Sequence, residues 1–147
     1  MESEEWVYGF YNHIPCGRFL CDEHLIQTVK EDGRIGDLHR VFERTVGQYT
    51  GLSDKNGVLV FEGDIIETTG GRQSVISVVK FGEYFPKMFY HMLDNLYPRK
   101  KHVPAVGFYA ESVDCGECMI LFQSKCVEVI GNIHDNPELL EVEHGDS

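Results

Sequence analysis

The segment that most constrains the fold runs from Val46 to Gly57 and is closed by a Glu62-Gly63-Asp64 step. It places two strand-like pieces around Asn56-Gly57, a dipeptide that supplies the positive φ values a tight turn requires. A glycine between two acids just before a strand is typical of a turn or bulge. The segment therefore predicts a specific β-hairpin that leads directly into a further strand.

The rest of the chain also favours strands. Hydrophobic residues make up 42% of the 147 residues, enough for one globular domain with its own core. The most regular hairpin is expected from strands at 64–69 and 74–81, joined at Gly70-Gly71. Since no repeat or linker divides the chain, we predict a single, mainly β domain over 1–147. Further strands are expected at 6–11, 18–21, 24–29, 41–49, 105–110, 119–122 and 125–130, with a turn or loop at 31–37.

Two helical pieces interrupt this β pattern. Apolar residues recur at helical spacing within 86–97, so we expect a short amphipathic helix there, ended by Pro98. Its stripe of Met, Phe and Leu either joins the core or forms a groove for a partner. Asn136-Pro137 predicts a helical turn, with Asn136 as cap and Pro137 at the first position. An acidic tail follows at 141–147.

The formal net charge of −11 argues against binding to duplex DNA, because such binding depends on basic side chains. Acidity serves solubility in most proteins, and the alternative is a basic partner protein. No apolar run approaches the ~18 residues of a membrane-spanning helix, and the acidic N-terminal residues are unlike a signal peptide. We therefore expect a cytoplasmic protein without membrane contact.

Short motifs stand in a defined order along the chain: Trp6-Val7-Tyr8-Gly9, 46–52, 54–57, 61–65, 79–84, 107–109 and 129–140. In order and spacing this set resembles the YopX family of phage and prophage proteins. The resemblance implies a phage or mobile-element origin and a mainly β domain with a small SH3-like barrel, and it reads 85–103 as an insertion. It implies no reaction, because the family offers no catalytic residues to carry over. We interpret the signature residues as structural: Trp6, Gly47, Tyr49, Gly51, Asp54, Asn56, Gly57, Glu62, Gly63, Asp64, Gly131, Asn132 and Pro137.

Cys115-Gly116-Glu117-Cys118 has the Cys-x-x-Cys spacing that lets two thiolates reach one zinc ion. Cys126 and His134 are the nearest further ligands in the sequence, whereas a second Cys-x-x-Cys pair is missing. A redox role would place the motif at a helix N-terminus, and here it lies between strand-like segments. The alternatives are a plain loop with reduced thiols, a zinc site on Cys115, Cys118 and Cys126, or a redox pair. No organic cofactor is expected.

Two charged clusters complete the candidates. Glu62 and Asp64 are read as caps of backbone amides, with an acid–base pair or a cation site that includes Asp54 as the alternative. The basic run at 99–102 is interleaved with aromatic residues, a combination that suits single-stranded nucleic acid, although a short basic loop is usually only solvated. The tentative binding residues of this insertion are Phe89, Tyr97, Arg99, Lys100 and Lys101.

Three functions follow from these patterns. The first is a non-enzymatic phage accessory protein that acts through protein–protein contacts, as a homo-oligomer or with a host or phage partner, using edge strands or the insertion. The second is a small nucleic-acid-binding module that uses the basic insertion. The third is a metal-dependent enzyme built on Glu62, Asp64 and nearby histidines. The absence of any complete catalytic motif places the first ahead of the other two.

Overall fold

The computed structural model describes residues 5–15, 22–86, 103–121 and 125–141. Strands make up 53% of the described residues and helical turns make up 6%, which confirms the mainly β prediction. The contacts divide the chain into two compact units, Met1–Val46 (unit 1) and Gly47–Ser147 (unit 2). The single domain over 1–147 stays a prediction. No helix in the described part of the chain is long and apolar enough to span a membrane.

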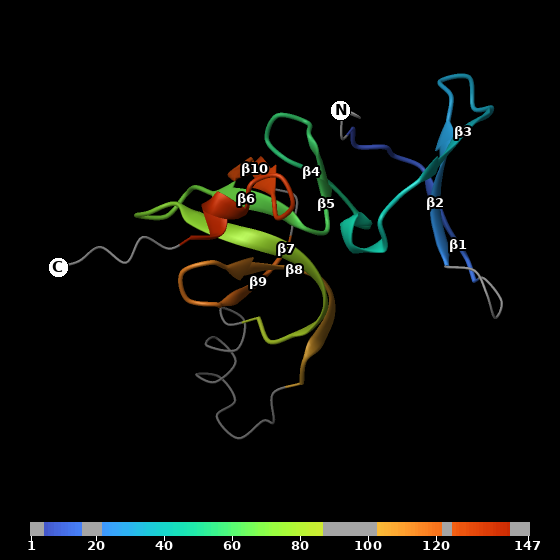
Figure 1. Ribbon diagram of the computed structural model, residues 1–147. Coiled ribbons are helices and arrows are strands. Elements are labelled where there is room, and N and C mark those ends of the chain that lie inside the picture. Colours follow the sequence, from blue (N-terminus) through green and yellow to red (C-terminus); the bar gives the residue numbers. More distant parts are fainter. Residues whose placement is uncertain (1–4, 16–21, 87–102, 122–124, 142–147) are drawn as a thin grey trace. The chain divides into compact units, whose positions relative to one another are not determined.

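Unit 1 is a three-stranded antiparallel sheet in the order β1-β2-β3 (Figure 1). Its strands are β1 (Phe10–Ile14), β2 (Glu23–Val29) and β3 (Ile35–Arg40), and the 3-10 turn η1 (Glu43–Thr45) follows them. Strand β2 confirms the strand expected at 24–29, whereas β1 begins later than the strand expected at 6–11, and the strand expected at 18–21 lies outside the described residues.

Two expectations for unit 1 hold only in part. The segment 31–37 was expected to be a turn or loop, and a turn is present, closed by Gly33 N–H on the Lys30 carbonyl, but β3 begins at Ile35 and continues through Gly36 and Asp37. These two residues have low β propensity and lie at a register shift in the pairing with β2. Side chains of β2 hold them there, because Gln27 Nε2 donates to the Gly36 carbonyl and Thr28 Oγ1 donates to the Asp37 carbonyl. The segment 41–49 was expected to be extended, but it contains η1, whose Thr45 donates its hydroxyl to the carbonyl of Phe42 at 2.8 Å.

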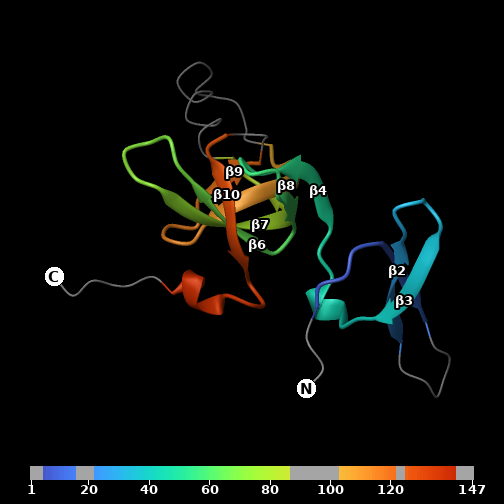
Figure 2. The ribbon, with the colours of Figure 1, turned by 90° about the horizontal axis from the view of Figure 1, so that it is seen from above.

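Unit 2 is built on a five-stranded antiparallel sheet in the order β10-β6-β7-β8-β9 (Figure 2). Strands β6 and β7 confirm the hairpin turned at Gly70-Gly71. The described strands do not close into a barrel, so the SH3-like barrel is not confirmed. The elements are β4 (Tyr49–Ser53), β5 (Leu59–Phe61), β6 (Asp64–Thr68), β7 (Val75–Tyr84), β8 (Ala105–Ser112), β9 (Cys118–Ile120), β10 (Val127–Asn132) and the 3-10 turn η2 (Pro137–Leu140).

The segment read as an insertion connects two directly paired strands. Strands β7 and β8 pair as far as Tyr84 opposite Ala105, so 85–103 spans the end of this hairpin. Pro86 forms an isolated parallel bridge with Cys118 of β9. The helix expected at 86–97 otherwise lies outside the described residues, and so does the tail beyond Glu141.

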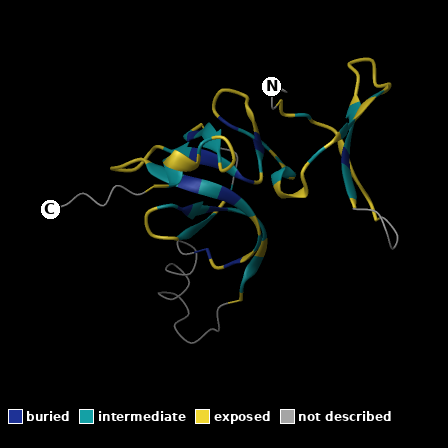
Figure 3. Cartoon of the chain, in the orientation of Figure 1, coloured by how far each residue is buried: buried dark blue, intermediate teal, exposed yellow. Residues whose placement is uncertain are grey.

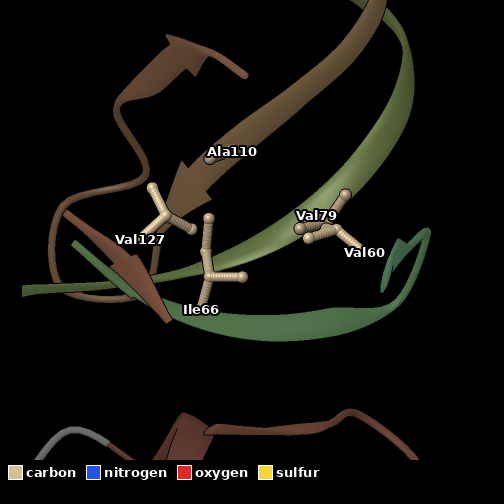
Figure 4. Packing of buried hydrophobic residues seen from close by; sticks show 5 residues of the cluster. All are labelled: Val60, Ile66, Val79, Ala110 and Val127. Atoms are coloured by element: carbon tan, nitrogen blue, oxygen red, sulfur yellow. The ribbon is translucent and has the colours of Figure 1, made fainter. Parts of the chain in front are cut away.

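The hydrophobic core lies in unit 2. One side chain each from β5, β6, β7, β8 and β10 meets in a single cluster (Figure 4). Val79 is fully buried, and the strand period of two explains why its neighbours Val78 and Lys80 do not join the cluster. Among the described residues of unit 1, Leu25 is the only buried hydrophobic side chain, and Figure 3 shows the contrast in burial. The cluster consists of Val60, Ile66, Val79, Ala110 and Val127.

Candidate functional site

The Asn56-Gly57 turn has a different geometry from the one expected. Gly57 has a φ of 81°, but no non-glycine residue in the described ranges has a positive φ, so Asn56 does not. The turn is closed by Gly57 N–H, which donates to the carbonyl of Asp54 at 3.1 Å. The Asp54 side chain also accepts from Asn56 N–H at 2.8 Å. A three-residue hairpin loop needs only one residue with positive φ, and Gly57 supplies it.

Asp54 is 4% exposed and connects two parts of unit 2. Its carboxylate accepts hydrogen bonds from the backbone N–H groups of Asn56, Val58 and Val129, the last two at 2.9 Å. Burial acts to raise the pKa of Asp54, but the three amide bonds act the other way and leave the pKa below its usual value. The carboxylate is therefore held ionised by backbone donors, as in a structural anchor.

Lys55 strengthens the same junction. Its N–H donates to the carbonyl of Val127 at 2.9 Å, and its Nζ lies 2.6 Å from Glu128 Oε2. The turn between β4 and β5 is thus bonded along the outer edge of β10. Both charged groups are more than one third exposed, so this ion pair adds little to stability, and the backbone bonds carry the connection.

Asp64 accepts one hydrogen bond, from Phe61 N–H at 2.8 Å. Burial raises its pKa to about 6, against the opposing effect of that bond. Both backbone groups of Gly63, which precedes Asp64, are hydrogen-bonded. Its N–H donates to the carbonyl of Val79, and its carbonyl accepts from the N–H of Ile133. Asp64 acts here as the expected cap, whereas Glu62 is exposed and contributes its backbone N–H to Gln48.

The remaining signature residues of unit 2 also shape the backbone. A Cβ on Gly47 would clash with the carbonyl oxygen of Glu62, so only glycine fits there. Tyr49 contacts Phe61 across the β4–β5 hairpin, with ring centroids 5.5 Å apart. Gly51 has a φ of 83° and lies where the pairing of β4 with β5 is irregular. Trp6 belongs to unit 1 and is 41% exposed.

The closing motif is folded around two asparagines. Pro137 begins η2, which confirms the helical turn, but the Asn136 side chain does not cap it. Instead, Asn136 Oδ1 accepts from Asn132 N–H at 3.2 Å, across a position where a Cβ on Gly131 would clash with it. Asn132 Oδ1 in turn accepts from the N–H groups of His134 and Asp135. The side chains of this motif are used in local hydrogen bonds that hold the turn, so the motif is structural rather than a reactive site.

The Cys-x-x-Cys motif lies in the turn between β8 and β9. Cys115 is exposed and Cys118 is partly buried. Burial and the charge of Glu111 raise the pKa of the Cys118 thiol, and Lys80 opposes them. A raised thiol pKa and a hairpin turn are both unlike a redox pair, which needs a low pKa at a helix N-terminus. No group of three metal-ligating side chains occurs among the described residues, and zinc binding by Cys115, Cys118 and Cys126 stays a prediction.

The binding residues expected in the insertion, from Phe89 to Lys101, lie outside the described residues.

A cluster in unit 1 was missed by sequence reasoning. The ring of His24 is stacked on His13, with centroids 4.8 Å apart, and its Nδ1 is hydrogen-bonded to the hydroxyl of Tyr11. His13 Nε2 lies 3.3 Å from Asp22, and His24 Nε2 lies 3.8 Å from Glu43. The sequence signal for this cluster is the strand spacing of Tyr11 and His13, which puts both side chains on one face of β1.

This cluster does not resemble a metal centre. The two imidazole planes are within 5° of parallel, so their nitrogen lone pairs do not converge on one point. Each ring instead has its own carboxylate neighbour, and His24 also contacts Tyr11. The arrangement fixes the rings on one face of β1 and β2.

No curated protein matches the chain. The family model described as YopX protein matches residues 18–141, a range that contains every signature residue of unit 2 and excludes Trp6. Because this match covers most of the chain and contains the Asp54 junction, the Asp64 cap and the Gly131-Asn132 turn, the chain belongs to the YopX family.

Proposed function

We propose that this chain is a phage-type accessory protein that works through protein–protein contacts and associates with itself. The observation that supports this most strongly is the apolar surface of unit 1. Single exposed hydrophobic residues are ordinary, but a concentration of them marks an interaction surface. The large side chains of unit 1 that are at least 41% exposed are Trp6, Tyr8, Phe10, Tyr11, Ile14, Val29, Ile35, Leu38 and Phe42.

The size of unit 1 supports the same proposal. A three-stranded sheet needs a buried apolar face to offset the conformational entropy lost on folding. In the described part of unit 1 that face is reduced to Leu25. A partner that covers the remaining apolar side chains would supply the missing burial, as oligomerisation does for other small folding units.

The chemistry of the sites in unit 2 points the same way. The signature carboxylates Asp54 and Asp64 are engaged by backbone amides, so they serve the fold rather than a substrate. An enzyme would need further groups around them, and no metal-ligating group of three occurs within the described ranges. We extend the proposal to a cytoplasmic location, where the exposed thiol of Cys115 would stay reduced.

Sedimentation velocity on the full chain, from about 1 to about 200 µM, tests self-association. We expect the weight-average sedimentation coefficient to rise with concentration. A strict monomer over the whole range would reject the self-association and leave a basic host or phage protein as the partner to seek. Loss of the apolar surface in a Phe10→Ser, Leu38→Ser double variant should reduce association, while Phe81→Ser, which removes an exposed aromatic ring of unit 2, is the matched control.

A further inference from the structure

Strand β1 forms one edge of the unit 1 sheet, and β2 lies on its inner side (Figure 1). No strand in the described part of the chain pairs with its outer side. An open edge presents backbone donors and acceptors to any chain that can add a strand.

The direction of the backbone groups follows from one hydrogen bond. Val41 N–H, which follows β3, donates to the carbonyl of His24 at 2.8 Å, so the His24 backbone faces the β3 side. Backbone groups of successive strand residues point to opposite sides. Leu25 therefore faces β1, and its register partner Asn12 faces β2 in return. The residues on either side of Asn12 direct their N–H and C=O groups out of the sheet.

Strand β1 carries none of the features that usually protect an edge. All five residues from Phe10 to Ile14 are exposed, and none is an aspartate, glutamate, lysine, arginine or proline. The opposite edge is different, because β3 carries Asp37 and Arg40. Charged side chains on an edge strand discourage pairing with another chain. Of the two edges of this sheet, β1 is the one suited to accept a strand.

The sequence of β1 is complementary to itself. If two copies pair antiparallel with Asn12 opposite Asn12, then Phe10 of one copy lies opposite Ile14 of the other, and Tyr11 lies opposite His13. Opposed residues share one face of a sheet, so apolar meets apolar on one face and aromatic meets aromatic on the other. A two-fold axis through such a pair gives the closed, isologous interface typical of dimers.

We propose that β1 of one molecule pairs with β1 of a second copy, antiparallel and centred on Asn12, to form a continuous six-stranded sheet. Tyr11 and His13 of each copy exchange N–H···O=C bonds with their counterparts, and the two Asn12 side chains face each other in a close, non-hydrogen-bonded pair. Because only a short strand is involved, the dimer is weak and depends on concentration. This inference rests on the proposed self-association and assigns it to one edge.

Complementary charges at position 12 test the register. Asn12→Lys alone places two lysines opposite each other, and Asn12→Asp alone places two aspartates there, so each variant should weaken the dimer about tenfold. An equimolar mixture should recover association, because lysine then faces aspartate. The side-chain bond of Asn12, to the exposed carbonyl of Phe10, is minor, so both variants should fold, as circular dichroism would show. Asp37→Lys, at an exposed position on the other edge strand, is the matched control and should leave the dimer unchanged.

Sedimentation velocity and fluorescence-labelled mixing report the outcome. Recovery of the dimer in the mixture supports the proposal, since a folding defect in either variant would not be repaired by the other. Association that persists in Asn12→Lys but is lost in Asp37→Lys would overturn the β1 edge and leave the proposed self-association intact. A wild-type chain that stays monomeric would overturn both.

Discussion

The carboxylate of Asp54 accepts a hydrogen bond from the N–H of Val129, 75 residues further along the chain, at 2.9 Å. Val129 lies on β10, the edge strand of the five-stranded sheet, and Lys55 N–H donates to the carbonyl of Val127 on the same strand. A turn therefore occupies the place that a further strand would take. The single carboxylate of Asp54 therefore accepts hydrogen bonds from N–H groups of the local turn and from an N–H group on the edge strand of the sheet.

Replacing Asp54 with asparagine should separate these two tasks. Asparagine keeps one oxygen for the turn amides of Asn56 and Val58 but turns its NH₂ group toward Val129 N–H, where two donors then meet. We expect the free energy of unfolding to fall by about 2 kcal/mol. Urea unfolding, followed by circular dichroism, measures the change.

Asp32→Asn is the matched control for Asp54→Asn. Asp32 also accepts a backbone bond two residues on, from Arg34 N–H at 3.0 Å, but it lies in an exposed turn and reaches no distant strand. Its replacement should change stability by less than about 0.5 kcal/mol. Equal losses in the two variants would show that the bond to Val129 contributes nothing beyond the turn.

Asp64 should make stability depend on pH between about 4 and about 7. Burial raises its folded pKa to about 6, above the 3.8 of an unperturbed aspartate. The protonated form is therefore the one that folding favours, and its stabilising contribution is present below the unfolded pKa and lost as pH rises through the folded pKa. Asp64→Asn keeps an oxygen for Phe61 N–H and cannot ionise, so it should exceed the wild type in stability above about pH 7 by on the order of 2 kcal/mol.

Parallel urea unfolding at about pH 4.5 and about pH 7.5 measures this effect. The gap in unfolding free energy between Asp64→Asn and the wild type should widen at the higher pH. Glu83→Gln removes an exposed carboxylate from β7 and controls for the loss of one negative charge. A gap that is the same at both pH values would contradict the raised pKa.

Local chemistry explains which parts of the fold could be predicted from the sequence. The β6–β7 hairpin was predictable because β-branched residues from Val75 onward alternate in burial and Gly70-Gly71 marks the turn. Strand β3 was not predictable, because Gly36 and Asp37 favour a loop. They lie at a register shift in the pairing with β2, where side chains of β2 donate to their carbonyls. A strand of this kind is stabilised by its neighbour, and its own residues carry no signal for it.

The candidate sites show the same division. The roles of Asp54 and Asp64 as partners of backbone amides were predictable, because acids beside turns commonly bind N–H groups. The bond between Asp54 and Val129 could not be predicted. Val129 is distant in the sequence, and any residue type at that position would offer the same backbone N–H. The stacking of His13 on His24 was missed for a related reason, since it depends on the register of β1 with β2.

The thiol of Cys118 should react slowly with iodoacetamide. Burial and the charge of Glu111 hold its pKa above the usual value, so little thiolate is present near neutral pH. In a chain whose other four cysteines are serines, Glu111→Gln should lower the pKa and increase the labelling rate, because Lys80 then acts without an opposing carboxylate. Mass spectrometry over a range of pH measures the rate. Glu83→Gln is the control, and equal acceleration by both variants would contradict a specific effect of Glu111.

Gly131→Ala should destabilise unit 2 through Asn136. The added Cβ would clash with Asn136 Oδ1, which accepts from Asn132 N–H, so the turn after β10 must open or shift. We expect a loss of about 1–3 kcal/mol in urea unfolding, whereas Gly71→Ala, where the nearest atom lies 3.7 Å away, should be close to neutral. If the clash is the cause, adding Asn136→Ala to Gly131→Ala should cost less than the sum of the two single changes. Additive losses would place the effect of Gly131 in the backbone of β10 and not in its contact with Asn136.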